Sequence, residues 1–144
     1  MRSNPSKGAA LRTTIASSVA TILLLVAAGA CAHAQAEWKQ IAVKDGESIE
    51  LQTVYWVLNC RSTLVALPEV EILQGPPQVT LSINEAQVVP RRHGCAAAVP
   101  GARLTLTAKG ISEPIETKLT YRLNYKTRDG IRHLSHNYIV SLFP

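Results

Sequence analysis

A short basic segment beside a cysteine is the strongest candidate site in the sequence. Arg91, Arg92 and His93 follow one another, and Cys95 lies two residues further on. Because clustered positive charge attracts anions, the segment is predicted to hold an anionic ligand such as a phosphate, an acidic polysaccharide or a lipid headgroup. A disulfide at Cys95 would preorganise such a contact, since it would tether the loop. The alternative interpretation is a solvated loop that the disulfide pins in place.

The two cysteines beyond the first 34 residues, Cys60 and Cys95, form an isolated pair. In an oxidising compartment such a pair is predicted to be a disulfide. Closing a loop of about 36 residues stabilises a fold by about 3–4 kcal/mol, less any strain. A redox-active or metal-binding thiol pair is the alternative, but the sequence has no Cys-x-x-Cys to favour it.

His133 and His136 have the spacing His-x-x-His, which on a helix would bring two metal ligands together. The segment is predicted to be a strand, however, where residues three apart point to opposite faces. His136 is then expected on the apolar face, partly buried and hydrogen-bonded, and His133 on the outside near Lys126. The sequence therefore predicts no metal site.

The sequence lacks the patterns that mark common catalytic centres. There is no Gly-x-Ser-x-Gly, and Glu69 and Glu71 are typical of a solubilising strand face, whereas a glycosidase needs two carboxylates across a cleft. Gly75-Pro76-Pro77 cannot cradle a phosphate through successive backbone N–H groups, because proline has none. We therefore predict no catalytic residues and no cofactor.

The first 34 residues have the pattern of a secretory signal peptide. Basic side chains open the segment, residues 15–30 are strongly apolar, and Ala32-His33-Ala34 is a small-x-small cleavage site. Cleavage between Ala34 and Gln35 would leave a single domain, residues 35–144, in the periplasm or outside the cell. The alternative of an uncleaved membrane anchor is less favoured, because the strongly apolar part is short for a span that needs about 20 residues.

Cys31 offers a second way of processing the chain. It follows Ala28-Gly29-Ala30, which resembles a lipoprotein box except that Ala28 stands where such boxes usually carry Leu. Lipidation at Cys31 would anchor the protein to the membrane, whereas cleavage after Ala34 would remove Cys31 altogether. Only the first alternative gives the protein a membrane partner.

Much of the net positive charge belongs to the predicted signal peptide. The formal net charge is +5, from 15 Lys and Arg against 10 Asp and Glu. Three of the basic residues and none of the acidic ones lie in residues 1–34, so residues 35–144 keep 12 basic and 10 acidic side chains and a net charge of +2. A charge this small gives no reason to expect a nucleic-acid partner.

Short segments of alternating or β-branched residues fill the rest of the chain and predict about seven to eight strands. Asp45-Gly46 is predicted to join the first two strands in a hairpin, and Pro100-Gly101 is predicted to be a turn. Trp38 shares a strand face with Gln40 and Ala42, so we expect it to be exposed. The segments are 38–44, 48–52, 53–60, 69–73, 78–84, 103–108 and the two halves of 118–143.

The clearest strand pattern is the terminal segment Lys118–Phe143, in which two alternating runs flank Asp129-Gly130. We predict a hairpin with a type I′ turn at Asp129 and Gly130. In that register Tyr121 faces Tyr138 and Leu123 faces His136, and one face of the hairpin is apolar and aromatic. Since each half-apolar sheet needs a partner, the predicted fold is an antiparallel β-sandwich, with a small barrel as the alternative.

The terminal hairpin resembles the F–G hairpin that ends bacterial immunoglobulin-like domains, through residues 119–125, Asp129-Gly130 and residues 138–142. The whole chain also resembles small exported proteins of unknown function from Gram-negative bacteria, through Cys60 and Cys95, Gly75-Pro76-Pro77 and the terminal Ser-Leu-Phe-Pro. The resemblance implies an immunoglobulin-like β-sandwich and brings no activity with it. The usual immunoglobulin disulfide joins strands B and F, yet the segment matching strand F has no cysteine, so the likeness would concern architecture only.

The function expected from these features is that of an exported, non-catalytic binding or envelope-associated module. Its partner would be an unknown protein or glycan of the envelope. The alternative is a small periplasmic inhibitor or chaperone-like protein that acts through the loop around Cys95.

Overall fold

The computed structural model of the protein describes residues 36–144. The predicted signal peptide, its cleavage site between Ala34 and Gln35 and the lipidation candidate Cys31 lie outside the described residues. Within the described residues, no helix is long and apolar enough to cross a membrane.

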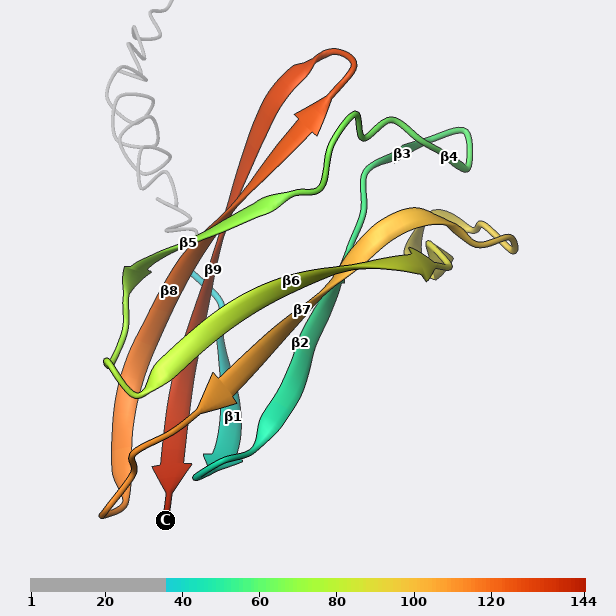
Figure 1. Ribbon diagram of the computed structural model, residues 1–144. Coiled ribbons are helices and arrows are strands. Elements are labelled where there is room, and N and C mark those ends of the chain that lie inside the picture. Colours follow the sequence, from blue (N-terminus) through green and yellow to red (C-terminus); the bar gives the residue numbers. More distant parts are fainter. Residues whose placement is uncertain (1–35) are drawn as a thin grey trace, which may run out of the picture. The chain divides into compact units, whose positions relative to one another are not determined.

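The described chain is all-β, as predicted, and its main strands form two sheets (Figure 1). The four-stranded sheet has the order β1 (Trp38–Lys44), β9 (Gly130–Phe143), β8 (Ile115–Thr127), β5 (Glu69–Gln74). The three-stranded sheet has the order β2 (Ser48–Val54), β7 (Val99–Ala108), β6 (Val79–Val88). A small ribbon of β3 (Val57–Leu58) and β4 (Arg61–Ser62) and a 3₁₀ turn, η1 (Arg91–His93), complete the described elements. Neighbouring strands are antiparallel except β1, which runs parallel to β9.

One hydrophobic core joins the two sheets, because alternate side chains of each sheet point toward the other. In β7, Leu104 and Leu106 are fully buried, and in β8 the same holds for Leu119, Tyr121 and Leu123. Each fully buried side chain of this size contributes about 1.5–3 kcal/mol relative to an exposed one. The predicted pairing of two half-apolar sheets is therefore the arrangement observed.

The β8–β9 hairpin turns at Arg128 and Asp129, with Thr127 opposite Gly130. The predicted type I′ turn is wrong, because neither Arg128 nor Asp129 has a positive φ, whereas Gly130 has φ 115°. Glycine is favoured directly after a turn of this length, and the Thr127 hydroxyl donates to the Gly130 carbonyl at 2.7 Å. The turn therefore begins one residue earlier than Asp129.

The new turn shifts the register of the hairpin by two residues. Tyr121 pairs with His136 rather than with Tyr138, and Leu123 pairs with Leu134 rather than with His136. A two-residue shift leaves every side chain on its predicted face, since the side-chain period of a strand is two. The hairpin face that carries Tyr121 and Tyr138 is therefore buried, as predicted.

Asp45-Gly46 does not form the predicted hairpin, because β1 pairs with β9 and β2 pairs with β7. The two residues instead turn the chain from one sheet into the other. The Asp45 N–H donates to the Phe143 carbonyl at 2.8 Å, and the Gly46 N–H donates to the Ala108 carbonyl at 2.8 Å. The Ala108 N–H also donates to the Glu47 carbonyl at 3.1 Å, so hydrogen bonds to both sheets hold this corner.

Two other segments differ from the prediction. The strand expected at 53–60 ends at Val54, because Asn59 and Cys60 have φ values of 50° and 58° and reverse the chain between β3 and β4. Left-handed backbone suits asparagine and favours a turn over a strand. Pro100-Gly101, predicted as a turn, lies inside β7.

Cys60 and Cys95 form the predicted disulfide, with their Cα atoms 5.5 Å apart. The bond joins the β3–β4 turn to the segment that follows η1, so neither cysteine lies in a strand of the two main sheets. A disulfide is compatible with an oxidising compartment.

Candidate anion-binding cleft

The basic segment predicted as a ligand site forms η1, and Arg91, Arg92 and His93 are all exposed. Its backbone is fixed at both ends of the turn. The Gly94 N–H, at φ 70°, donates to the Arg91 carbonyl at 3.0 Å, and the Cys95 N–H donates to the Pro90 carbonyl at 3.3 Å. The segment is therefore a turn closed by its own hydrogen bonds and tied by the disulfide.

The three basic side chains of η1 do not share one site. Arg92 lines a cleft at the open side of the sandwich, whereas Arg91 and His93 are not among the residues that line it. The His93 ring packs edge-on against Tyr55, with ring centroids 5.8 Å apart. Of the three predicted ligand residues, only Arg92 therefore lines this cleft.

The cleft has a volume of about 350 Å³. It receives side chains from β1, β2, η1, β8, β9 and the residue that follows β2. The polar lining residues are Lys39, Gln52, Thr53, Tyr55, Arg92 and His136, and the larger apolar ones are Leu51, Tyr125 and Leu134.

The cleft exists because β1 covers only part of β9. The β1–β9 ladder begins at Trp38 opposite Asn137, so residues 130–136 of β9 have β8 on one side and no strand of the described residues 36–144 on the other. Leu134 and its partner Leu123 share the inner face, yet Leu134 is 43% exposed and Leu123 is fully buried. The first half of β9 thus has an inner face that the facing elements cover only partly at Leu134.

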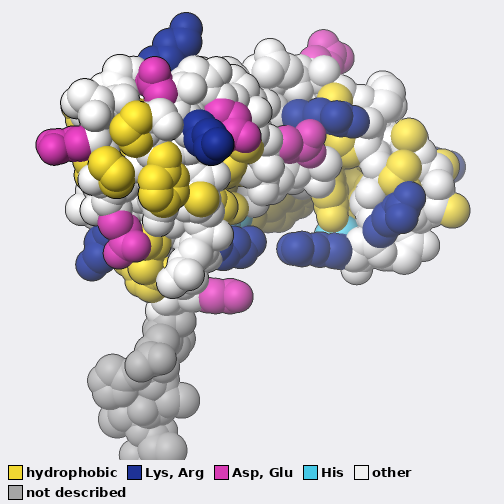
Figure 2. Space-filling model, turned by 90° about the horizontal axis from the view of Figure 1, so that it is seen from below, with side chains coloured by type: hydrophobic (Ala, Val, Ile, Leu, Met, Phe, Trp, Pro, Cys, Tyr) yellow, Lys and Arg dark blue, Asp and Glu magenta, His cyan; other side chains and the backbone are white. Residues whose placement is uncertain are grey.

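The lining of the cleft includes two permanently charged cations and no carboxylate. Lys39 comes from β1, Arg92 from η1 and His136 from β9, and no Asp or Glu lines this cleft. The ion pairs in the described part of the chain join Arg103 to Glu50, Arg122 to Glu71 and Lys126 to Glu69, none of which lines the cleft. The space-filling view shows Lys and Arg side chains on both sides of a hollow, with histidine beside it (Figure 2).

Among the basic residues that line the cleft, His136 is the most buried. It is half-buried, its ring stacks on Tyr121 with centroids 5.2 Å apart, and the Gln52 Nε2 atom lies 3.4 Å from its Nε2 atom. Burial lowers the pKa of His136, and the positive charge of Lys39 lowers it further. An anion in the cleft would oppose both effects, because it favours the charged imidazolium.

Two buried tyrosines adjoin the basic residues: Tyr125 lines the cleft, and the Tyr121 ring stacks on His136. Burial, and secondarily the proximity of Tyr55, raises the pKa of Tyr125 to about 12. Burial also raises the pKa of Tyr121, whose hydroxyl is buried without a hydrogen-bond partner. Neither phenol is ionised near neutral pH, so neither one cancels the positive charge of the lysine and the arginine.

A neighbouring hollow of about 340 Å³ shares Lys39 and His136 with the cleft. It is also lined by Ser135, Asn137 and Tyr138 of β9 and by Glu37. The concave surface therefore follows the edge of β9 past the start of β1.

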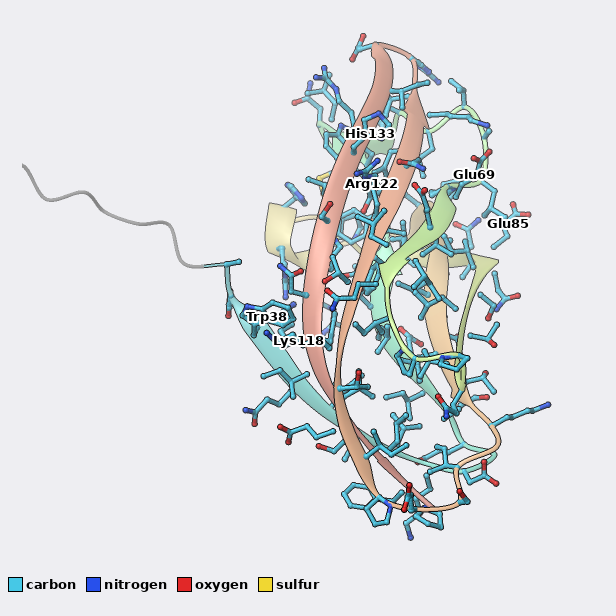
Figure 3. All side chains as sticks on the ribbon, turned by 90° about the vertical axis from the view of Figure 1, so that its left-hand side faces the viewer. Trp38, Glu69, Glu85, Lys118, Arg122 and His133 are labelled. Carbon is cyan, nitrogen blue, oxygen red and sulfur yellow. A yellow bond between two sulfur atoms is a disulfide. The ribbon has the colours of Figure 1, made fainter. Side chains whose placement is uncertain are left out.

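His133 lies on the other face of the sheet, where its Nδ1 atom is 2.6 Å from Oδ1 of Asn124. It is labelled with Arg122 on that face in Figure 3. Residues 36–144 hold no group of three or more His, Cys, Asp or Glu side chains that could bind a metal ion. The two histidines of the His-x-x-His spacing therefore occupy separate environments.

Trp38 is 38% exposed, as predicted, but its ring is not free. The Lys118 Nζ atom lies 5.2 Å from the ring centroid, a cation–π contact that Figure 3 shows on the outer side of β1 and β8. The lysine covers one face of the ring, so Trp38 is a weaker candidate for ligand stacking than the cleft.

No protein-family model and no curated protein matches the chain. The site is therefore defined by its geometry. Sequence reasoning missed Lys39 and Gln52, because they reach the cleft only through the parallel β1–β9 ladder and the edge position of β2. The signal that was present in the sequence is the basic segment with its cysteine, and it located one of the cleft's two permanent cations.

Proposed function

We propose that the protein is an exported, non-catalytic binding protein that holds an anionic group of its partner in the cleft between β2 and β9. The observation that carries this proposal is the convergence of Lys39, Arg92 and His136 from three separate segments on one cleft that no carboxylate lines. Positively charged groups in such a concave surface attract anions, and this attraction is stronger there than on an open surface.

The proposal includes the place where the protein works. The signal-peptide pattern of residues 1–34 and a disulfide compatible with an oxidising compartment support the periplasm or the cell exterior. Lipidation of Cys31 would instead tether the same domain to a membrane. The alternative role as an inhibitor acting through the Cys95 loop remains a prediction from the sequence.

Two neighbouring arginines provide a matched test of the cleft. The Arg92→Ala and Arg91→Ala variants each remove one exposed guanidinium from η1, but only Arg92 lines the cleft. On a carboxymethyl resin eluted with a NaCl gradient, we expect Arg92→Ala to elute at a clearly lower salt concentration than Arg91→Ala. Equal shifts of both variants would show that retention follows net charge alone.

Lys39 and Lys109 form a second matched pair. Both are exposed lysines, but Lys109 follows β7 and is not part of the cleft. We expect Lys39→Ala to weaken retention further in the Arg92→Ala background and Lys109→Ala to change it little. Unchanged retention of the Lys39 and Arg92 double variant relative to the wild type would overturn the proposed function.

A further inference from the structure

We infer that the anionic group belongs to an extended acidic peptide segment of a partner protein, which adds as a strand to the free edge of β9. This inference rests on the proposed function, because it names the class of ligand that the same cleft would take.

The free edge of β9 recognises extended backbone. Residues 130–136 pair with β8 on one side, and the β1 ladder begins only at Asn137. A strand with one free edge presents unpaired N–H and C=O groups, which bind an added strand through main-chain hydrogen bonds. The edge of β9 already accepts such pairing from Asn137 to Phe143, where β1 lies beside it.

The inner face beside this edge provides a place for alternate side chains of the added strand. Leu134 is 43% exposed on the inner face of β9, and the neighbouring Tyr125 and Leu51 line the same cleft. Arg132 pairs with Tyr125 and so lies on that inner face as well. An added strand would place every second side chain against these residues and cover them, since strand side chains alternate between faces.

The charge of the surroundings specifies acidic side chains. Lys39, Arg92 and the half-buried His136 lie at the β1 end of the free edge, where Glu37 lines the neighbouring hollow, and Arg132 lies toward the hairpin turn. The seven residues 130–136 span about 23 Å at about 3.3 Å per residue. A segment of about seven residues with inward acidic side chains near both ends and an apolar one between them fits this arrangement.

An acidic glycan would satisfy the positive charge but not the backbone edge. A sugar chain has no regular row of amide groups to match the repeat of a β-strand. The free edge of β9 therefore favours a peptide, and glycan binding becomes an outcome that the test must separate.

The first experiment selects ligands without assuming a sequence. A phage-display library of random heptapeptides is selected on the exported protein as purified, and the recovered peptides are synthesised. We expect enrichment of Asp or Glu near both ends of the peptide, with an apolar residue between them on the same face. A selected peptide methylated on alternate backbone nitrogens keeps its charges but cannot pair along the edge, and we expect its affinity to fall about tenfold or more.

The second experiment uses two leucine-sized side chains on opposite faces of β9. Leu134 faces the cleft, whereas Ile131, which pairs with Lys126, lies on the outer face and is 61% exposed. We expect Leu134→Ser to weaken the selected peptide several-fold and Ile131→Ser to leave its affinity unchanged. Hydrogen exchange should show new protection in residues 130–136 when the peptide is bound.

The outcomes separate the inference from the proposed function. If the methylated peptide binds as well as its parent, or hexagalacturonate binds more tightly than any selected peptide, the strand-addition inference fails while anion binding stands. If acidic peptides are not enriched and retention on the carboxymethyl resin does not depend on Lys39 and Arg92, both fail. Loss of binding on methylation, together with dependence on Leu134, supports the inference.

Discussion

At the scale of single residues, His136 is where the electrostatics of the cleft are most sensitive to pH. Burial lowers its pKa below the ordinary value of 6.5, and the charge of Lys39 acts in the same direction. The pKa of His136 should therefore rise when an anion enters the cleft, because an anion favours the charged imidazolium. The other titratable groups that line the cleft and its neighbouring hollow or stack on the His136 ring are Glu37, Lys39, Tyr55, Arg92, Tyr121, Tyr125 and Tyr138.

The lowered pKa of His136 predicts how the free protein responds to acid. The unfolded chain takes up a proton near pH 6.5, and the folded state does so only at lower pH. Stability is therefore unaffected by this group above pH 6.5 and falls as the pH drops through 6.5 toward the folded pKa. Urea denaturation at pH 7.5 and pH 5.5 should show a smaller loss for His136→Gln than for the wild type.

The matched control for that prediction is His133→Gln. His133 is exposed on the other face of the sheet, so its replacement should leave the pH dependence nearly as it is in the wild type. A His136→Gln variant that loses as much stability as the wild type would contradict the role assigned to burial and Lys39.

Two hydroxyl groups allow the cost of a buried polar atom to be compared. The Tyr121 hydroxyl is buried without a partner, whereas the buried Thr127 donates its hydroxyl to the Gly130 carbonyl at 2.7 Å. Removing a satisfied hydroxyl costs about 1 kcal/mol, and removing an unsatisfied one is nearly neutral or stabilising. Thermal and urea unfolding should therefore rank Thr127→Val as less stable than Tyr121→Phe, and the reverse order would refute the assignment.

At the scale of the elements, the sequence predicts which face of a strand is buried better than it predicts the partner of that strand. Tyr121, Leu123 and Tyr138 are buried as the alternation indicates, although the hairpin register differs by two residues. Alternation cannot detect such a shift, because it repeats every two residues. For the same reason it could not show that β1 pairs with β9 rather than with β2.

Gly101 belongs to a sequence pattern that is typical of turns, but it lies inside a strand. Pro100-Gly101 has the composition of a turn, yet both residues belong to β7. A Cβ atom on Gly101 would lie 2.6 Å from the Val54 carbonyl oxygen and 2.7 Å from Cγ2 of Val88. Glycine inside a strand can mark such a close backbone approach, which a sequence alone does not distinguish from a turn.

Replacing Gly101 by alanine should therefore force β2 away from β7. Overpacking of this kind costs about 1–3 kcal/mol, and urea denaturation measures the loss. Because Gln52 and Thr53 of β2 line the cleft, ligand retention should fall with stability. An alanine variant as stable as the wild type would contradict the close approach at Val54.

At the scale of the whole domain, strand pairing in the four-stranded sheet is less complete at its β1 edge than at its β5 edge within the described residues. β5 pairs with β8 opposite the buried Tyr121 and Leu123, whereas the other end of that sheet leaves the first half of β9 free. The candidate site is this incomplete side, and no single motif in the sequence encodes it. It arises because β1 is shorter than β9 and η1 brings Arg92 across the opening.

The disulfide connects the stability of the domain to the position of Arg92. It closes a sequence separation of 35 residues between the β3–β4 turn and the segment after η1. Chain-entropy arguments give about 3–4 kcal/mol for a loop of this length. Urea denaturation of the Cys60→Ser/Cys95→Ser double variant should show a loss of about that size, and reductant should lower the wild type to the same level without affecting the variant.

The same variant should also bind more weakly than its stability alone explains, under conditions where it remains folded. Without the tether, η1 keeps the hydrogen bonds of its own turn, such as that from the Gly94 N–H to the Arg91 carbonyl, and the edge-on contact of His93 with Tyr55. Arg92 would then lose the fixed position from which it faces Lys39 and His136, and ordering it would cost entropy at each binding event. Unchanged retention on the carboxymethyl resin would show that the turn is held by its backbone and that the disulfide serves stability alone.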